Sequence, residues 1–226
     1  MKRLMMVGII VCLAANMALA QSVSLGIAAK GSTMGLGLDA IVQFNEKMVL
    51  RAGFDHIGAQ QSFEFEEAGV TYDVLADVKT GGISTMFGYY LTPGIFATAG
   101  LTLNNFNTVA SGVAITGYTY GDLVIPPEKV GTFTFDIVPE LRISPYLGIG
   151  FGRLLNHNRL VGISFEMGAF YQGSPVFNIE SDGMLSPTSN PDLGHEEYLE
   201  RQFSQYSIYP VLKGSISFRL SGGRVN

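Results

Sequence analysis

Hydrophobic and polar residues alternate along much of this chain, most regularly from Thr132 to Phe151. Every odd position in that stretch is apolar, beginning with Phe133 and Phe135, whereas the even positions are mostly polar or glycine. Successive side chains of a strand point to opposite faces, so the pattern predicts one strand with an apolar face and a polar face. Strands of globular proteins usually have about 5–6 residues. A continuous strand of this length is typical of a barrel that crosses a bilayer.

The same period of two predicts eight strands. Their approximate ranges are 22–30, 35–44, 48–55, 72–91, 95–104, 132–151, 161–171 and 212–220. In the fourth range the apolar positions change parity near Gly81 and Gly82, which predicts a β-bulge there. Pro139 and Pro145 lie inside the sixth. Because proline cannot donate a hydrogen bond to the ladder, we expect a local bulge at Pro145 as well.

After the first one, the connections alternate in length. Residues 45–47, 92–94 and 152–158 form short connections, and residues 57–72, 105–131 and 173–206 form long ones. An even number of strands places both termini and all short turns on one side. This arrangement predicts an all-β, eight-stranded antiparallel up-and-down transmembrane β-barrel with short periplasmic turns and long outer loops.

The last long connection also carries a helical pattern. Leu199 and Phe203 are four residues apart in the segment from Pro191 to Phe203, and such spacing places both side chains on one face of a helix. We expect a short amphipathic helix that packs on the rim of the barrel. A lid or a partner-binding helix is the alternative.

Composition favours a membrane barrel over a soluble one. Charged residues make up 15% of the chain, against about 25% in soluble domains. Mean hydropathy is +0.27, yet after residue 20 no apolar run is long enough for a spanning helix, which excludes a helical membrane protein. A soluble lipocalin-like barrel is the alternative, with apolar residues inside. Its exterior would carry lysine and glutamate, whereas the polar faces of this chain are rich in glycine.

The N-terminus has the features of a secretory signal. Lys2 and Arg3 precede an apolar stretch, residues 4–13, and Ala18-Leu19-Ala20 forms a small-x-small cleavage site. We expect residues 1–20 to be removed and residues 21–226 to form the barrel in the bacterial outer membrane. The single cysteine, Cys12, would leave with the signal, so the mature chain would have no disulfide, thiol nucleophile or cysteine metal site.

Charge narrows the range of partners. Lys2 and Arg3 are two of the 14 basic residues, so the mature chain would carry 12 basic against 19 acidic residues, a net charge of −7. An excess of acid argues against nucleic acid as a partner. We expect contact with the lipid bilayer and lipopolysaccharide, and with the outer-membrane assembly machinery. The ligand of the outer loops stays open.

Charged residues on the polar faces would lie inside the barrel. Six acids and five bases nearly cancel, which predicts a paired polar network that plugs a narrow lumen, since unpaired buried charges are costly. The alternative is a gated ion path, that is, a narrow porin-like channel, or a proton-responsive switch. The predicted network comprises Asp39, Arg51, Asp55, Asp77, Lys79, Asp136, Glu140, Arg142, Glu166, Lys213 and Arg219.

The histidines give little support for chemistry. His56, His157 and His195 are not spaced as a set of zinc ligands, and we expect no cofactor, metal or catalytic residue. Some outer-membrane barrels are lipid-modifying enzymes with a serine–histidine arrangement. This alternative depends on His56 near Ser62 and Glu64, and on His195 near Ser204.

Three short motifs carry a family resemblance. Pro145-Tyr146-Leu147-Gly148-Ile149-Gly150-Phe151-Gly152, Tyr171-Gln172-Gly173-Ser174-Pro175, and Tyr209-Pro210-Val211 leading into Ser217-Phe218-Arg219-Leu220 resemble segments of small bacterial outer-membrane barrel proteins. In architecture the chain is similar to eight-stranded OmpA/OmpX-type barrels. The motifs say nothing of activity. Our leading hypothesis from the sequence is a non-enzymatic outer-membrane protein that anchors surface loops for envelope integrity or surface interaction.

Overall fold

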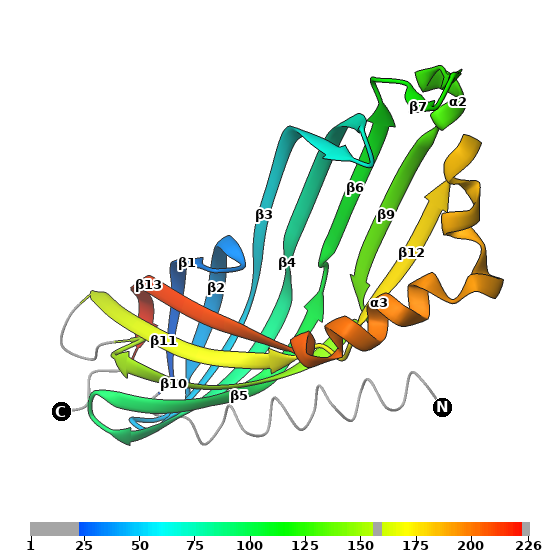
Figure 1. Ribbon diagram of the computed structural model, residues 1–226. Coiled ribbons are helices and arrows are strands. Elements are labelled where there is room, and N and C mark those ends of the chain that lie inside the picture. Colours follow the sequence, from blue (N-terminus) through cyan, green and yellow to red (C-terminus); the bar gives the residue numbers. More distant parts are fainter. Residues whose placement is uncertain (1–22, 156–159, 223–226) are drawn as a thin grey trace, which may run out of the picture.

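The computed structural model describes residues 23–155 and 160–222. Its centre is a ring of eight antiparallel strands, each hydrogen-bonded to the next (Figure 1). β4 pairs with both β3 and β5, which closes the ring. In order around the ring the strands are β1 (Ser24–Ser32), β2 (Gly35–Gln43), β3 (Met48–Glu67), β4 (Val70–Thr92), β5 (Ile95–Asn104), β10 (Ile143–Gly152), β11 (Val161–Tyr171) and β13 (Ile208–Gly222).

The same sheet continues beyond one end of this ring, here called the sheet end (Figure 1). β3 and β4 continue beyond the ring, and β6 (Asn107–Ala114), β9 (Thr132–Pro139) and β12 (Pro175–Ser181) extend them sideways. We call these five strands, with β3 from residue 57 and β4 up to residue 80, the outer sheet. The connections between β2 and β3 and between β4 and β5 lie at the opposite end of the ring, the turn end, whereas the two-residue connection between β1 and β2 lies at the sheet end.

The predicted long outer loops therefore contain regular structure. Residues 57–72 form a strand hairpin, and the other two long connections supply β6 and β12 together with a small hairpin and several helices. The described part of the chain has thirteen strands instead of eight, because strands outside a membrane need no lipid-facing alternation to be stable. The remaining elements are β7 (Tyr118–Tyr120), β8 (Leu123–Ile125), α2 (Pro127–Val130), η1 (Gly183–Ser189), η2 (Pro191–Leu193), α3 (His195–Phe203) and η3 (Ser204–Ser207).

The stretch from Thr132 to Phe151 is two strands, so the prediction of one continuous strand is wrong. β9 belongs to the outer sheet and β10 to the ring, and the chain leaves the strand conformation at residues 140–142. The two strands also face opposite ways. Phe135 pairs with Ala110 and Ala110 with Ala76, which lies on the lumen-facing side of β4. Apolar odd residues thus face inward in β9 and outward in β10, as at Leu147.

The bulge expected at Gly81 and Gly82 is absent. The register between β3 and β4 runs without a shift from Met48 opposite Tyr89 to Glu67 opposite Val70. Instead, β4 changes its other neighbour at this point, from β5 to β6. Gly81 has φ +129°, and a Cβ there would collide with the carbonyl oxygen of Asp55. Glycine is needed because the strand bends where it leaves the ring.

Pro145 also lies in a ladder without a bulge. β10 pairs with β5 in unbroken register, with Pro145 opposite Leu101, and its pairing with β11 begins only at Tyr146. Pro145 thus lies just beyond the end of the ladder between β10 and β11, where no pair requires its missing N–H. The expectation of a compensating bulge was wrong because the strand begins only two residues earlier.

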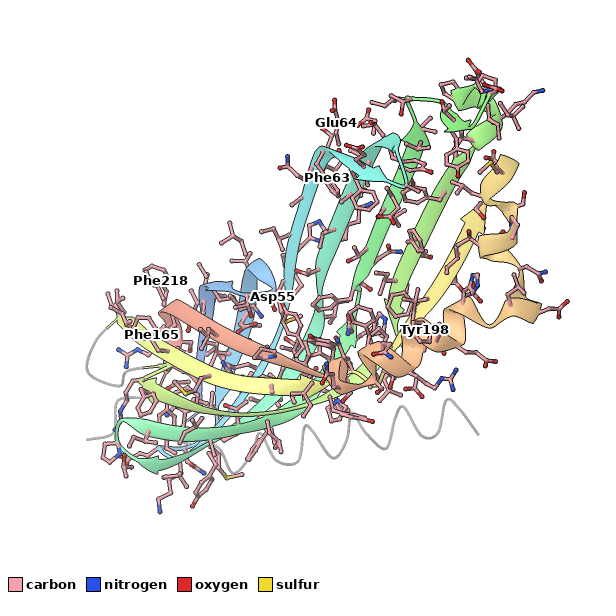
Figure 2. All side chains as sticks on the ribbon, viewed as in Figure 1. Asp55, Phe63, Glu64, Phe165, Tyr198 and Phe218 are labelled. Atoms are coloured by element: carbon pink, nitrogen blue, oxygen red, sulfur yellow. The ribbon has the colours of Figure 1, made fainter. Side chains whose placement is uncertain are left out.

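The predicted amphipathic helix is confirmed as α3. It packs along β12 of the outer sheet, with the rings of Phe203 and Phe177 5.5 Å apart. Figure 2 shows Tyr198 on this helix, far from Phe63 at the end of β3. Among the described residues, no helix combines the length and the apolar character needed to span a membrane.

Candidate functional site

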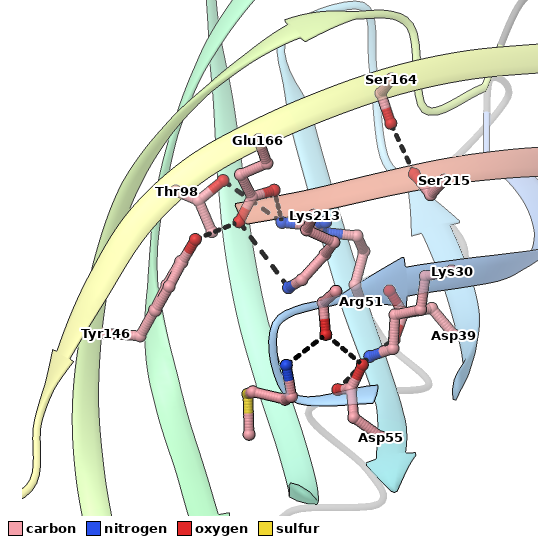
Figure 3. Close-up of polar contacts among 12 residues, drawn as sticks. Lys30, Asp39, Arg51, Asp55, Thr98, Tyr146, Ser164, Glu166, Lys213 and Ser215 are labelled. Carbon is pink, nitrogen blue, oxygen red and sulfur yellow. Dashed lines mark hydrogen bonds and ion pairs between the residues drawn. The ribbon is translucent and has the colours of Figure 1, made fainter. Parts of the chain in front are cut away.

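The middle of the ring holds six charged side chains that are almost completely buried. They are supplied by β1, β2, β3, β11 and β13, each at a lumen-facing position. Three acids balance three bases, so the layer is electrically neutral, as buried charges require. The six residues, here called the ionic layer, are Lys30, Asp39, Arg51, Asp55, Glu166 and Lys213 (Figure 3).

Lys30 joins three neighbouring strands. Its Nζ lies 2.6 Å from Oδ1 of Asp39 and 2.8 Å from Oδ2 of Asp55. The second oxygen of Asp55 accepts a hydrogen bond from the Ser32 hydroxyl at 3.3 Å. One ammonium group therefore neutralises two carboxylates, and the arrangement fixes β1, β2 and β3 relative to one another.

Arg51 and Glu166 connect opposite sides of the ring. Four places separate β3 and β11 around the eight-strand ring, yet Arg51 Nη2 lies 2.6 Å from Glu166 Oε2. Tyr146 donates to the other carboxylate oxygen at 2.8 Å, and Lys213 Nζ lies 3.9 Å from it. Glu166 is thus held by three side chains, and the pair crosses the lumen at mid-height (Figure 3).

Apolar layers cover the ionic layer at both ends. At the turn end, the connection after β10 folds into the ring, so that Leu154 and Leu155 are 1% and 2% exposed. The Leu154 N–H donates to the Tyr90 hydroxyl at 2.8 Å. At the sheet end, a second cluster fills the lumen with Met34, Met86, Tyr146, Phe170 and Val211. The interior is therefore packed at three successive levels along the axis.

Five of the eleven residues predicted for the lumen network lie in this layer: Asp39, Arg51, Asp55, Glu166 and Lys213. The sequence prediction missed Lys30. In β1, even-numbered Lys30 lies on the face opposite to odd-numbered Leu25 and Ile27, so the alternation did indicate a lumen position. It was overlooked because it stands at the end of its apolar run.

The structure places the other six elsewhere. Asp77, Lys79 and Asp136 belong to the outer sheet, beyond the end of the ring. Glu140 and Arg142 are exposed at the break between β9 and β10, and Arg219 is half-buried opposite Gly26 near the turn end. These residues do not share one lumen, because β4 and the 132–151 stretch extend outside the ring.

Asp77 forms a separate, exposed cluster on the outer sheet. Lys79 Nζ lies 3.0 Å from Asp77 Oδ2, and Gln60 Nε2 donates to the same oxygen at 3.2 Å. These hydrogen bonds, the one from Lys79 first, hold the pKa of the Asp77 carboxyl below its usual value. Such polar side chains mark the outward face of β3 and β4 beyond the ring as a surface in contact with water.

The serine and histidine residues that lie near each other in the sequence do not form a catalytic site. His56 and Ser62 lie on one strand six residues apart, which corresponds to about 20 Å at about 3.3 Å per residue. His195 and Ser204 stand at opposite ends of α3, where His195 Nδ1 contacts the Thr188 carbonyl and Ser204 donates to the Arg201 carbonyl. His157 lies outside the described residues. Within residues 23–155 and 160–222, no cluster of three or more histidine, cysteine or acidic side chains could hold a metal.

The two edges of the outer sheet differ. At the β12 edge, α3 supplies carboxylates to the backbone: Ile179 N–H donates to Glu196 Oε1 at 2.8 Å, and Phe177 N–H donates to Glu200 Oε1 at 3.4 Å. These glutamates are four residues apart on the helix, and the amides are two residues apart on the strand. The helix therefore satisfies the open edge of β12. Within residues 23–155 and 160–222, no helix covers the opposite edge, along residues 57–67 of β3, where Gln61 Nε2 donates to the Ser62 carbonyl at 3.1 Å.

Comparison with known proteins identifies the fold. No protein-family model and no curated protein matches the sequence. Among solved structures, Acinetobacter baumannii CarO is similar with TM-score 0.54 and 20% identity over 87% of this chain and 97% of that chain. Acinetobacter baumannii CarO2 gives TM-score 0.56 and 18% identity over 88% and 99% of the two chains. The chain therefore has the antiparallel all-β fold of outer-membrane β-barrel proteins.

Proposed function

We propose that this chain is a non-enzymatic outer-membrane barrel that anchors the outer sheet at the cell surface. The observation that carries the proposal is the packed lumen, in which Leu154 and Leu155, the ionic layer, and the cluster around Tyr146 follow one another along the axis. A ring filled in this way is suited to holding an attached sheet in place. Its role would be surface interaction or envelope integrity.

The outward face of the ring supports a position in the bilayer. Within the described residues, no aspartate, glutamate, lysine or arginine occupies an outward position of the ring strands. Many of the side chains at these positions are large, apolar and exposed, such as Leu147 and Phe165. A charged side chain there would cost about 2–4 kcal/mol at mid-bilayer. Beyond the ring the outward face becomes polar, with Gln60 and Asp77. This change supports lipid around the ring and water around the outer sheet.

The proposal includes the partners that such a location requires. Phospholipid and lipopolysaccharide would surround the ring, the assembly machinery would insert it, and residues 1–20 would be removed during export. N-terminal sequencing of the protein from isolated outer membranes is expected to begin at Gln21. Electrophoresis with and without boiling is expected to show a mobility shift, because closed barrels resist detergent until heated. A mature chain that stays folded in buffer without detergent would contradict the proposal.

A narrow channel is the first competing function, and planar-bilayer recording separates it from a filled ring. We expect no reproducible unitary conductance from the purified protein. Steps that recur across preparations, and that change when Arg51 is replaced by alanine, would show that the lumen conducts.

A lipid-modifying enzyme is the second competing function. We expect no fatty acid to be released when the protein is incubated with lipopolysaccharide or phospholipid, because His56 lies six residues from Ser62 along one strand and His195 and Ser204 stand at opposite ends of α3. Released fatty acid that disappears in the His56→Ala or His195→Ala variant would overturn the assignment.

A further inference from the structure

One edge of the outer sheet is left open along β3. β2 pairs with β3 only as far as Leu36 opposite His56, and it begins at Gly35. Beyond this point β3 continues for residues 57–67, whose other side is paired to β4 throughout. No strand of residues 23–155 or 160–222 pairs with the free side of this segment. All residues of the segment are exposed.

The free side carries backbone hydrogen-bonding groups. The Tyr90 N–H donates to the Lys47 carbonyl, and the register from there to Glu67 is unbroken. In an antiparallel ladder successive residues turn their N–H and C=O groups to alternate sides. Odd residues of β3 therefore bond to β4, and the free edge is formed by the even residues Gly58, Gln60, Ser62, Glu64 and Glu66.

Natural proteins protect such edges, and the same sheet does so on its other side. There Glu196 and Glu200 of α3 accept hydrogen bonds from the β12 amides. Residues 57–67 contain no proline and no lysine, and their pairing with β4 shows no bulge. Proline, lysine and bulges are among the devices that prevent an edge strand from pairing with another chain. The segment lacks these three and carries only acidic charges, at Glu64, Glu66 and Glu67, so it is open to a partner that complements them.

Side chains on the segment define what could dock. Ile57, Phe63 and Phe65 lie on the lumen side of the sheet, and the two phenylalanines are 48% and 46% exposed. Glu64 and Glu66 lie on the opposite face, and the segment contains no basic residue. Figure 2 shows Phe63 and Glu64 near the far end of β3, away from the ring.

We propose that the open edge of β3 binds an extended segment of another polypeptide, which adds to the outer sheet as an antiparallel strand. Main-chain hydrogen bonds would supply the affinity, and every second side chain of the added strand would supply the specificity. The fitting segment alternates apolar residues, which pack on Phe63 and Phe65, with lysine or arginine residues, which face Glu64 and Glu66. This inference rests on the proposed function, because it requires the outer sheet to lie outside the membrane.

Charge distinguishes this partner from a second copy of the chain. Pairing two β3 edges would bring together two segments that each carry three glutamates, Glu64, Glu66 and Glu67, with no base between them. The two segments would repel each other, because each carries a net charge of −3. A basic strand instead combines backbone pairing with charge attraction to Glu64 and Glu66, so it is the favoured partner.

A peptide titration tests the proposal. The probe is a fluorescent synthetic peptide of alternating lysine and valine, as long as the open edge, added to the full mature protein in detergent micelles. We expect saturable binding, measured by anisotropy, and weaker binding as salt rises. A peptide of alternating glutamate and valine should not bind. Failure of the lysine–valine peptide to bind would overturn the proposal.

Two variants of one position separate strand pairing from charge attraction. Ser62→Pro removes an N–H on the free side and leaves the bonds to β4 intact, so binding should weaken about tenfold or more, since pairing next to the proline is also blocked. Ser62→Ala keeps the N–H and should bind as the wild type does. Circular dichroism checks that both variants fold. Equal binding to Ser62→Pro would show attraction by charge alone and would overturn strand addition.

Charge reversal and sedimentation complete the test. The Glu64→Lys/Glu66→Lys variant should lose the lysine–valine peptide and gain the glutamate–valine peptide. Sedimentation of the wild type without peptide should show one protein copy per micelle. A dimer that Ser62→Pro abolishes would identify a second copy as the occupant instead. The boiling-dependent mobility shift is measured for every variant, and its absence in the wild type would contradict the proposed function rather than this inference.

Discussion

Glu196 in α3 accepts a hydrogen bond from the backbone N–H of Ile179 in β12, over 2.8 Å. A carboxylate thereby takes the place that the carbonyl of a neighbouring strand would occupy. Glu200, one helical turn later, does the same for Phe177. The helix therefore covers the edge of the sheet. These two hydrogen bonds explain why a helix with no buried residue lies along β12.

Removal of this cover should loosen β12. In Glu196→Ala, the Ile179 amide loses its acceptor, and a hydrogen bond of about 1 kcal/mol corresponds to about fivefold faster amide exchange. Hydrogen exchange followed by mass spectrometry over residues 175–181 measures the effect. Glu197→Ala is the matched control, because its side chain is exposed. Equal exchange in the two variants would show that the carboxylate does not protect the edge.

Breaking the pair that crosses the ring should be costly. Arg51→Met leaves Glu166 buried without its principal partner, and such a change destabilises by about 3–5 kcal/mol. The double variant Arg51→Met/Glu166→Met should recover part of this loss, because it removes the unpaired Glu166 carboxylate, although Lys213 Nζ then loses its acid partner. Unfolding by guanidinium in detergent, followed by circular dichroism, measures both.

The exposed Asp77–Lys79 pair on the outer sheet should behave differently from the buried Arg51–Glu166 pair. Lys79→Met removes a partner of Asp77, and no measurable loss of stability is expected, because water solvates both groups. The pKa of Asp77 should rise toward its usual value, since the hydrogen bond from Lys79 is the largest cause of its lowering. NMR titration of the carboxyl measures this shift. A stability loss equal to that of Arg51→Met would contradict the burial argument.

The leucines at the turn end should behave as core residues. Leu155→Ala leaves a cavity beside Phe96 and Tyr90, and buried leucines truncated in this way lose about 2–5 kcal/mol. Leu160→Ala is the control in the same connection, at 69% exposure, and should change stability by less than about 0.5 kcal/mol. Similar unfolding midpoints for the two variants would mean that the turn does not plug the ring.

The bend in β4 should depend on glycine. Gly81→Ala forces a Cβ onto the Asp55 carbonyl at φ +129°, and strain of this kind costs about 1–3 kcal/mol. Gly58→Ala, on the paired strand, meets only the Lys79 side chain at 4.0 Å and should be tolerated within about 0.5 kcal/mol. Thermal unfolding in detergent compares them. Equal stability of the two variants would show that the bend does not require glycine.

Much of the ring could be predicted from the sequence. Alternation with period two indicates which side of a strand meets lipid, so the ranges of β1, β2, β5 and β11, to within two residues, and the lumen positions of Arg51 and Glu166 follow from the pattern alone. The predicted range of β13, 212–220, covers only the central part of that strand. Helical spacing of Leu199 and Phe203 likewise identified α3. These features are local, because each depends on neighbours along one strand or one helix.

Other features depend on which segments meet in space, and the alternation of residues along the chain does not contain this information. The residues from Phe133 to Phe151 keep one parity, yet the break at 140–142 turns the apolar side of β9 toward the lumen side and that of β10 toward lipid. Strand partners such as β4 with β6, the meeting of Arg51 with Glu166 across the ring, and the cover of β12 by Glu196 all join distant segments. The sequence does not distinguish an apolar residue that faces lipid from one that packs against another side chain. Only the pairing of the strands shows which of these two environments the residue occupies.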